Sequence, residues 1–482
     1  MRTVIPIDPV TRLEGHLKIE VELEKVNNIL QVVDARATGT LFRGFERILV
    51  GLPPKDAPHL TQRICGVCPV AHAMASVNAL EAASNTKVPL NAVLERNLVS
   101  AANFIDSHIL HFYHLAAQDY ISGPNMPPWQ PCWDVDKRVS AADTNTLVAH
   151  YVAALDMRRK AHELGAVIGG RLPHVPSFIP GGITTVPQTQ ALAKVSAYLT
   201  ELTVWIQNVY IPDVQLVGAV YSDYFTIGRG YGNLLSFGVF DQDGTGNNLL
   251  LKRGSVTAGS STVQPVDLTA ITEQVEFSWF DNVDSNKHPS VGTTTPVYPK
   301  GDAYSWLKAP RYKGAPQECG PLARMWVTGL YRNGISVMDR HVARAYEALH
   351  IAKAMATWVG QIKTGQPVYT NPTAITSGTG FGLTEAARGA LGHWVSIANS
   401  KISRYQIITP TCWNGSPADG QGQHGPLERA LIGTPVQNEK MPVEVLRVIH
   451  SIDPCMGCAV HVVRPGKEEP VAVLDYGIPV RA

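Results

Sequence analysis

Apolar and polar residues alternate over residues 17–23, and a second mostly apolar stretch, residues 26–33, follows a short polar break. A period of two places one face of a strand against a core and leaves the other face to solvent. The two stretches therefore predict a β-hairpin near the N-terminus. A further alternation, of Val275, Phe277 and Trp279, predicts some short strands in the 228–285 region.

Five longer segments have apolar residues every three or four positions, which is the spacing of a helix face. They cover residues 71–83, 92–117, 147–168, 188–209 and 342–362. Between and after them lie loop-rich segments at 123–134, 228–263, 281–304 and 409–426. Long amphipathic or apolar helices bury their apolar faces most simply against one another. We therefore expect a mainly α fold with small peripheral β-sheets (α+β) around a helical bundle core.

The composition narrows the class of protein. Among 482 residues, 41 Lys and Arg balance 40 Asp and Glu, which argues against a strongly basic nucleic-acid surface. Charged residues make up 17%, below the usual quarter or so, which suggests buried interface. No apolar run reaches the ~18 residues of a transmembrane helix. The first eight residues lack the apolar core of a signal peptide.

The seven cysteines are too few for a disulfide scaffold, but four of them form two Cys-x-x-Cys pairs near opposite ends of the chain. The pairs are Cys65/Cys68 and Cys455/Cys458. Two residues between thiols allow both sulfurs to bind one soft metal ion, and two such pairs complete a four-sulfur site. The remaining cysteines, which stand alone, are Cys132, Cys319 and Cys412.

The cysteines by themselves leave a structural zinc site open. Zinc pairs usually lie about 15 to 20 residues apart and stabilise small domains, which this long chain does not need. A c-type haem requires His directly after the second Cys, where this chain has Pro69 and Ala459. A redox dithiol explains one pair but not both. The residues that flank the pairs must decide.

These flanking residues, with five other strings, resemble the large subunit of the nickel-iron hydrogenases. The resemblance rests on residues 8–16 (DPVTRLEGH), 42–46 (FRGFE), 63–72 (RICGVCPVAH), 107–114 (SHILHFYH), 320–324 (GPLAR), 388–394 (RGALGHW) and 453–461 (DPCMGCAVH). The strings follow the family's order over nearly the whole chain. They are most similar to the heterodimeric uptake enzymes and to the nickel-iron-selenium branch, which has selenocysteine at the position of Cys455.

The resemblance implies reversible heterolytic cleavage of H2 into protons and electrons. It implies that Cys65, Cys68, Cys455 and Cys458 bind nickel. Cys68 and Cys458 would bridge to an iron that also carries carbon monoxide and two cyanides. Cys455 is then the first proton acceptor, and Glu14 matches the family's proton-gate glutamate. From the residues alone, Glu14 could equally be a solvated carboxylate on a strand edge.

Three further residues match the family's pocket, and a fourth, His72, lies four residues after Cys68. Arg388 corresponds to an arginine above the open metal position, paired with Asp453, although an Arg is by default a surface charge. Thr411 corresponds to a hydroxyl that hydrogen-bonds a cyanide, and His72 could hydrogen-bond a sulfur or be an ordinary core histidine. The chain departs from the family at Ala387, where Pro is usual. The departure loosens the turn and makes the position of the guanidinium less certain.

Two smaller departures from family residues, at Cys412 and Cys319, are read as core substitutions. His108, His111 and His114 follow helical spacing and are expected to pack or hydrogen-bond rather than bind metal.

The resemblance also implies a magnesium (or iron) site formed by Glu46, the carbonyl of Ile407 and His461. Carboxylate and carbonyl oxygens suit magnesium, whereas an imidazole ligand is less usual for it. In the family, a nickel-dependent endopeptidase cuts after this His. We therefore expect one catalytic body over residues 1–461 and a C-terminal extension, 462–482, that is removed on maturation. Without the resemblance, the extension could be an ordinary terminal strand.

Electrons must leave the site, yet the three remaining cysteines are too few for an iron-sulfur cluster held by four thiolates. An iron-sulfur small subunit is therefore the expected partner. By resemblance, its export signal would carry the folded pair to the periplasm, with membrane association or a cytoplasmic location left open. The alternative function is a regulatory H2-sensing subunit with the same metal site. A quinone-reductase-like subunit of respiratory complexes is excluded, because it lacks the four cysteines.

Overall fold

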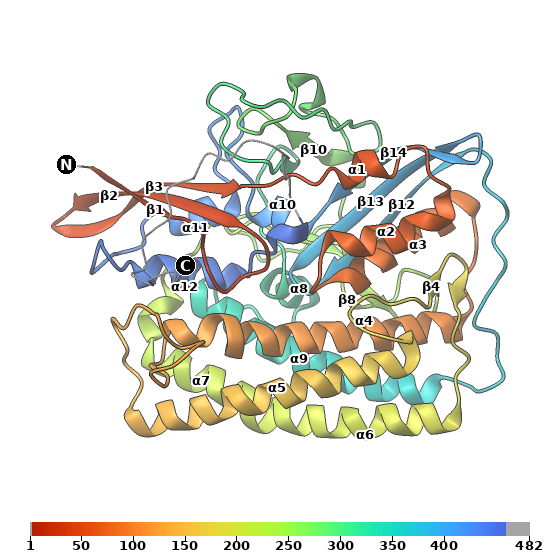
Figure 1. Ribbon diagram of the computed structural model, residues 1–482, viewed down its shortest axis with the longest axis horizontal. Coiled ribbons are helices and arrows are strands. Elements are labelled where there is room, and N and C mark those ends of the chain that lie inside the picture. Colours follow the sequence, from red (N-terminus) through yellow and green to blue (C-terminus); the bar gives the residue numbers. More distant parts are fainter. Residues whose placement is uncertain (1, 459–482) are drawn as a thin grey trace, which may run out of the picture.

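The computed structural model describes residues 2–458, apart from the side chain of Cys458. The predicted ligand His461 and the predicted extension 462–482 lie outside the described residues. The fold is α+β, as predicted, with a layer of long helices below small sheets (Figure 1). Within residues 2–458, no helix is long and apolar enough to cross a membrane.

The N-terminal sheet is antiparallel in the order β1 (Thr3–Ile7), β2 (Leu17–Val26) and β3 (Ile29–Gly39). Every second residue of β2 from Leu17 to Leu23 is buried, which accounts for the alternation in the sequence. Asn27 and Asn28 turn the chain with positive φ angles of 51° and 67°, a conformation that Asn tolerates. The predicted hairpin is confirmed, and β1 extends it.

The lower layer is a bundle of long helices (Figure 1). It contains α4 (Leu90–Leu110), α5 (Ala141–Gly169), α6 (Thr189–Trp205), α7 (Ile211–Val220) and α9 (Val337–Gln361). The helix predicted over 92–117 ends instead in a π-helical turn, His111–Ala116, and the one predicted over 188–209 ends in another, Ile206–Tyr210. The bundle core is otherwise as predicted.

Helix α3 (Pro69–Ser84), which follows the first cysteine pair, lies on a second antiparallel sheet. This sheet contains β12 (Gly378–Ala386), β13 (Gly389–Ala398) and β14 (Lys401–Ile408). A Cβ atom at Gly380 would lie 2.1 Å from the Ala79 carbonyl oxygen, and one at Gly382 would lie 2.0 Å from that of Ala75. The glycines therefore let helix and strand touch backbone to backbone.

Short elements connect these layers. The helices are α1 (Phe45–Ile48), α2 (Ala57–Thr61), α8 (Pro321–Thr328), α10 (Pro410–Asn414), α11 (Pro426–Leu431) and α12 (Val443–Ile452). The strands are β4 (Phe178–Ile179), β5 (Gly182–Ile183), β6 (Leu234–Ser236), β7 (Val239–Asp241), β8 (Leu249–Leu251), β9 (Gly254–Val256), β10 (Ile271–Gln274) and β11 (Ala309–Tyr312). Helix α10 lies in a segment predicted to be loop.

The short strands predicted in the 228–285 region are confirmed by β6 to β10, but the alternating residues Val275, Phe277 and Trp279 themselves follow the end of β10 at Gln274. The Lys300 amine donates to the carbonyl oxygens of Val275, Ser278 and Phe280 at 2.5, 3.1 and 2.7 Å. These carbonyls turn toward one cation and cannot all pair with a neighbouring strand.

Candidate metal centre

Three cysteine sulfurs meet in the interior, although two of the cysteines lie some 390 positions from the third. The Cys455 sulfur lies 3.3 Å from the Cys65 sulfur and 4.0 Å from the Cys68 sulfur. All three sulfurs lie within 4.8 Å of one another, and each residue is at most 2% exposed. These separations exceed the ~2.05 Å of a disulfide bond and suit ligands that share one ion.

The local backbone stabilises negative charge on this cluster. The N–H groups of Val67 and Cys68 both point to the Cys65 sulfur at 3.2 Å. Cys68 is the N-cap of α3, so its sulfur lies near the positive end of a helix dipole. The loop between the first two cysteines is therefore built for thiolates. The fourth predicted ligand, Cys458, has its backbone in the same region, but its side chain lies outside the described atoms.

Glu14 lies against the last cysteine pair. Its backbone forms a parallel β-bridge with Cys455, and its carbonyl accepts the Met456 N–H at 2.7 Å. Its carboxylate Oε2 accepts from the Cys455 thiol at 3.3 Å and from the Gly457 N–H. Burial raises the pKa of Glu14 above its ordinary value, and the charge of Cys65 adds to the increase. This carboxyl can therefore accept or return a proton at the Cys455 sulfur.

Arg388 stands at the turn between β12 and β13 and is 2% exposed. Its Nε donates to Asp453 Oδ1 at 3.1 Å, and its Nη1 donates to the Ser107 hydroxyl at 3.3 Å. Burial opposes the charge, but Asp453 and the three thiolates raise the pKa of Arg388 well above its ordinary value. Nη2 also lies 3.0 Å from Asp453 Oδ1, so two nitrogens of the guanidinium face the same carboxylate oxygen.

Thr411 lies in α10 and is 2% exposed. Its hydroxyl oxygen accepts the Cys455 N–H at 2.9 Å, which leaves the hydroxyl hydrogen available to a second partner. The residue thus fixes the backbone that carries one thiolate. Thr409 begins this helix, because its hydroxyl accepts the Cys412 N–H at 3.3 Å.

His72 starts a buried chain of side chains. Its Nδ1 lies 3.1 Å from His393 Nε2, His393 Nδ1 lies 2.9 Å from the Tyr405 hydroxyl, and that hydroxyl lies 3.0 Å from the Ser76 hydroxyl. His72 Nε2 is buried without a partner among the described residues. Burial lowers the pKa of His72 to about 4, so the ring is neutral. His393 stands in a recognised string without an assigned role, and sequence reasoning missed Tyr405 and Ser76, because only the contact between α3 and the sheet brings these residues together.

Glu46 and Ile407, the described residues expected at the magnesium site, line a cavity of about 70 Å³ beside Gly457. Glu46 accepts the Ile407 N–H at 2.8 Å and the Thr294 hydroxyl. Ile407 lies in the edge strand β14, where the N–H and C=O of one residue point to the same side. Its carbonyl therefore faces the Glu46 edge as well. These oxygen donors fit a hard cation such as magnesium.

Two further charged residues and one predicted core cysteine line this cavity. Burial raises the pKa of Glu273 to about 7, although Lys308 opposes the shift from 3.5 Å. Sequence reasoning missed both residues, since neither lies in a recognisable motif. Cys412 also lines the cavity, and burial raises the pKa of its thiol to about 11, so it is a neutral thiol.

The three histidines with helical spacing each bind a different partner. His108 Nε2 lies 2.8 Å from Glu347, His111 Nε2 lies 2.5 Å from the His450 carbonyl, and His114 Nε2 lies 3.1 Å from the Tyr151 carbonyl. They act as hydrogen-bonding groups in the core.

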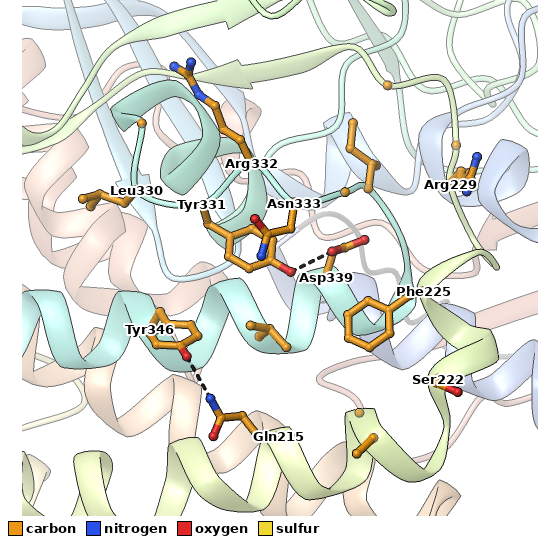
Figure 2. A pocket seen from close by; sticks show the side chains of 18 of the residues that line it. Gln215, Ser222, Phe225, Arg229, Leu330, Tyr331, Arg332, Asn333, Asp339 and Tyr346 are labelled. Carbon is orange, nitrogen blue, oxygen red and sulfur yellow. Dashed lines mark hydrogen bonds between the residues drawn. The ribbon is translucent and has the colours of Figure 1, made fainter.

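A surface cavity of about 1250 Å³ lies elsewhere and shares no residue with the predicted metal sites. Figure 2 shows it beside α7 and α9, with Tyr331 donating to Asp339 at 2.7 Å and Gln215 donating to Tyr346 at 2.9 Å. The cavity with the larger volume is therefore not the one beside the buried cysteines.

Comparison with known proteins agrees with this geometry. A family model described as nickel-dependent hydrogenase matches residues 43–131, 125–334 and 328–461. The chain therefore belongs to the nickel-dependent hydrogenase family. Within this family it is a large subunit, and the enzyme is an oxidoreductase. The alternative of a structural zinc site is therefore set aside.

The periplasmic [NiFeSe] hydrogenase large subunit of Desulfomicrobium baculatum is 42% identical, over 98% of this chain and 97% of that protein. The uptake hydrogenase large subunit of Bradyrhizobium diazoefficiens is 34% identical, over 96% of each. The reduced Ni-Fe-Se hydrogenase structure from D. vulgaris Hildenborough superposes with a TM-score of 0.92 at 42% identity, covering 96% of this chain and 100% of that one. These relatives are named as hydrogenases, and none is named as a regulatory sensor.

Proposed function

We propose that this hydrogenase subunit splits H2 reversibly at a nickel-iron centre held by Cys65, Cys68, Cys455 and Cys458. Cys68 and Cys458 would bridge to an iron that carries carbon monoxide and two cyanides. The observation that carries the proposal is the buried cluster of three sulfurs within 4.8 Å. Soft thiolates suit nickel and iron, and the buried positive charge of Arg388 stabilises negative charge beside them.

When bound, the centre supplies a Lewis-acidic metal with an open position and accepts the two electrons of H2. The protein's part is to take the proton away. The Cys455 sulfur accepts it and passes it to Glu14 Oε2, which lies 3.3 Å away. Because the pKa of Glu14 is raised, the proton transfer from the sulfur costs less free energy than it would with an exposed carboxyl as acceptor.

Three residues shape the pocket around this step. Arg388, held by Asp453, keeps a positive charge beside the thiolates. Thr411 fixes the Cys455 backbone and can donate its hydroxyl hydrogen to a cyanide. His72 offers its unpartnered Nε2 to a sulfur. Arg388 and Asp453 also exclude water, because both are nearly fully buried.

We propose a magnesium ion for the cavity beside Glu46 and the Ile407 carbonyl, with His461 as a third ligand. The clustered carboxylate and carbonyl oxygens support this assignment. We further propose that a maturation endopeptidase removes residues 462–482 after nickel insertion. The family match, which ends at residue 461, agrees with that boundary.

The electrons require a partner, which we propose to be an iron-sulfur small subunit in a heterodimer. Among the described residues, no cysteine outside the two pairs belongs to a group of three or more potential metal ligands. The Desulfomicrobium baculatum relative is named periplasmic, and we propose the same compartment here. Co-export with the small subunit would then carry the folded pair across the membrane into the periplasm.

Metal analysis and infrared spectroscopy of the purified heterodimer test the assignment. We expect nickel and iron near one each at this centre, carbonyl and cyanide stretching bands, and H2-dependent reduction of an artificial electron acceptor. Zinc alone, without these bands, in protein produced with its maturation machinery would contradict the proposal. Normal bands with negligible turnover would instead favour the sensor function.

A further inference from the structure

A second arginine, Arg324 in α8, lies directly behind the turn that carries Arg388. Its Nη1 donates to the Ala386 carbonyl at 3.0 Å, and its Nη2 donates to the Ala387 carbonyl at 2.7 Å. These are the two residues that precede Arg388 in the chain. One guanidinium thus holds both carbonyls of the segment that enters the turn.

The same guanidinium is fixed from the other side by two carboxylates. Glu347 accepts from Nε and Nη2 at 2.8 and 2.7 Å, and Glu385 accepts from Nη1 at 2.8 Å. The side chains of Arg324, Glu347 and Glu385 are all 0% exposed. Burial alone would raise the pKa of Glu347, but Arg324 and His108 lower it to about 2. Arg324 therefore cannot turn away without leaving buried charge unpaired.

Helix α4 connects the two arginines. Ser107 binds the Arg388 guanidinium at 3.3 Å, and the next residue, His108, binds Glu347 at 2.8 Å. One turn earlier, the Phe104 ring lies 5.1 Å below the Arg324 guanidinium. A single stretch of helix therefore sets where both guanidinium groups lie relative to each other.

The β12–β13 ladder closes the turn at the pair Ala386 and Gly389, but the two turn residues between them are not restricted by their own conformational preferences. Neither Ala387 nor Arg388 has a positive φ, so the turn is not of the type that Asn-Gly sequences predefine. Ala leaves φ free at a position where Pro would restrict it. Close packing helps on the far side, because a Cβ atom at Gly389 would lie 2.6 Å from the Cys319 sulfur.

We infer that Arg324 is a positioning residue, whose two bonds to the Ala386 and Ala387 carbonyls aim the Arg388 guanidinium at the thiolate cluster. This inference rests on the proposed role of Arg388. The planar fork matters, because an ammonium group cannot hold two carbonyls and two carboxylates in fixed directions.

The test compares Arg324→Lys with Arg324→Lys/Ala387→Pro in the purified heterodimer. We expect Arg324→Lys to lower kcat for H2 oxidation about 10-fold or more and to shift the carbonyl and cyanide bands, with nickel content retained. Proline restricts φ at residue 387, so the double variant should recover at least about threefold of the loss. Ala387→Pro alone should stay within about twofold of wild type.

The matched control is Arg96→Lys. Arg96, in α4, is likewise a buried arginine. It binds the Glu81 carboxylate and the backbone carbonyls of Ile179 and Gly182. It should leave kcat and the infrared bands unchanged.

Three results would overturn the positioning role. They are unchanged kcat and bands in Arg324→Lys, an equal loss in Arg96→Lys, and no recovery on adding proline. If Arg324→Lys yields no folded protein, Ala387→Pro alone still tests the proposal. A loss of activity in that variant would contradict the proposed turn conformation that aims Arg388. Failure of the proposed function is distinguishable, since wild type itself would then lack turnover and the bands.

Discussion

The Asp453 carboxylate lies 3.0 Å from the Arg388 guanidinium, and the two residues come from elements 65 positions apart. Asp453 ends α12 in the left-handed conformation, with φ at 60°. This sharp turn places its carboxylate toward Arg388 and, two residues later, places Cys455 in the sulfur cluster. The charge pair and the thiolate are therefore set by one backbone turn.

Replacing Asp453 by Asn should leave Arg388 buried without its counterion. We expect a loss of about 3–5 kcal/mol of unfolding free energy, because breaking a buried ion pair strands a charge. Turnover should fall as well, since the guanidinium loses one anchor. Denaturant unfolding and H2 oxidation measure the two effects. Asp156→Asn, at an exposed ion pair on α5, is the control and should change stability little.

Glu14→Gln should lower H2 oxidation by about 100-fold or more, because an amide cannot accept the proton. Glu14 must be ionised to accept a proton, and its pKa is raised. H2 oxidation in wild type should therefore decline with falling pH at a higher pH than an ordinary carboxyl would give, and this limb should disappear in the variant. Nickel content and infrared bands should not change. Wild-type activity in Glu14→Gln would rule out the relay, and Glu20→Gln, on β2, serves as control.

Thr411→Val should leave the buried Cys455 N–H without its acceptor, at a cost of about 1–3 kcal/mol. Thr411→Ser keeps the hydroxyl and should retain most of the stability. Denaturant midpoints of the two variants make the comparison. Equal midpoints would show that the hydrogen bond contributes nothing.

Glu95 in α4 should make stability depend on pH. The side chain is fully buried, neither carboxyl oxygen has a hydrogen-bond partner among the described residues, and burial raises its pKa to about 8. A raised pKa means that the folded state holds a proton that the unfolded state releases above its ordinary value of about 4.5. Stability from this group is therefore lost as pH rises toward 8.

Glu95→Gln removes that dependence, since an amide does not titrate. The variant's advantage over wild type should grow between about pH 5 and pH 8, reach a few kcal/mol, and then level off. Thermal inactivation of wild type and variant across this pH range measures the difference in stability. A difference that stays constant with pH would mean that Glu95 is ionised in the folded protein.

The sequence predicted the bundle and the N-terminal hairpin because their burial follows simple periods. It did not predict the sheet of β12–β14. Residues 389–395 of β13 are buried without interruption, so no alternation shows, and Gly380 and Gly382 remove side chains from β12 where it meets α3. The alternating residues Val275, Phe277 and Trp279 lie outside the short strands of their region for a different reason, since they belong to a loop whose carbonyls bind Lys300.

The site divides in the same way. Glu14, Cys65 and Arg388 stand in recognisable strings, so the sequence named them, and the structure brings them together. Arg324 stood in a recognised string without a role, while Glu347 and Tyr405 had no signal at all. Their contribution depends on contacts between elements tens or hundreds of residues apart, which no local pattern encodes.

The glycine contact between α3 and β12 has an evolutionary consequence. Two main chains in direct contact set the spacing between the first cysteine pair, which precedes α3, and the turn that carries Arg388 at the end of β12. A substitution that adds a side chain at Gly380 or Gly382 would push α3 and β12 apart, and with them these two parts of the pocket. These two positions therefore constrain divergence more tightly than the surrounding core does.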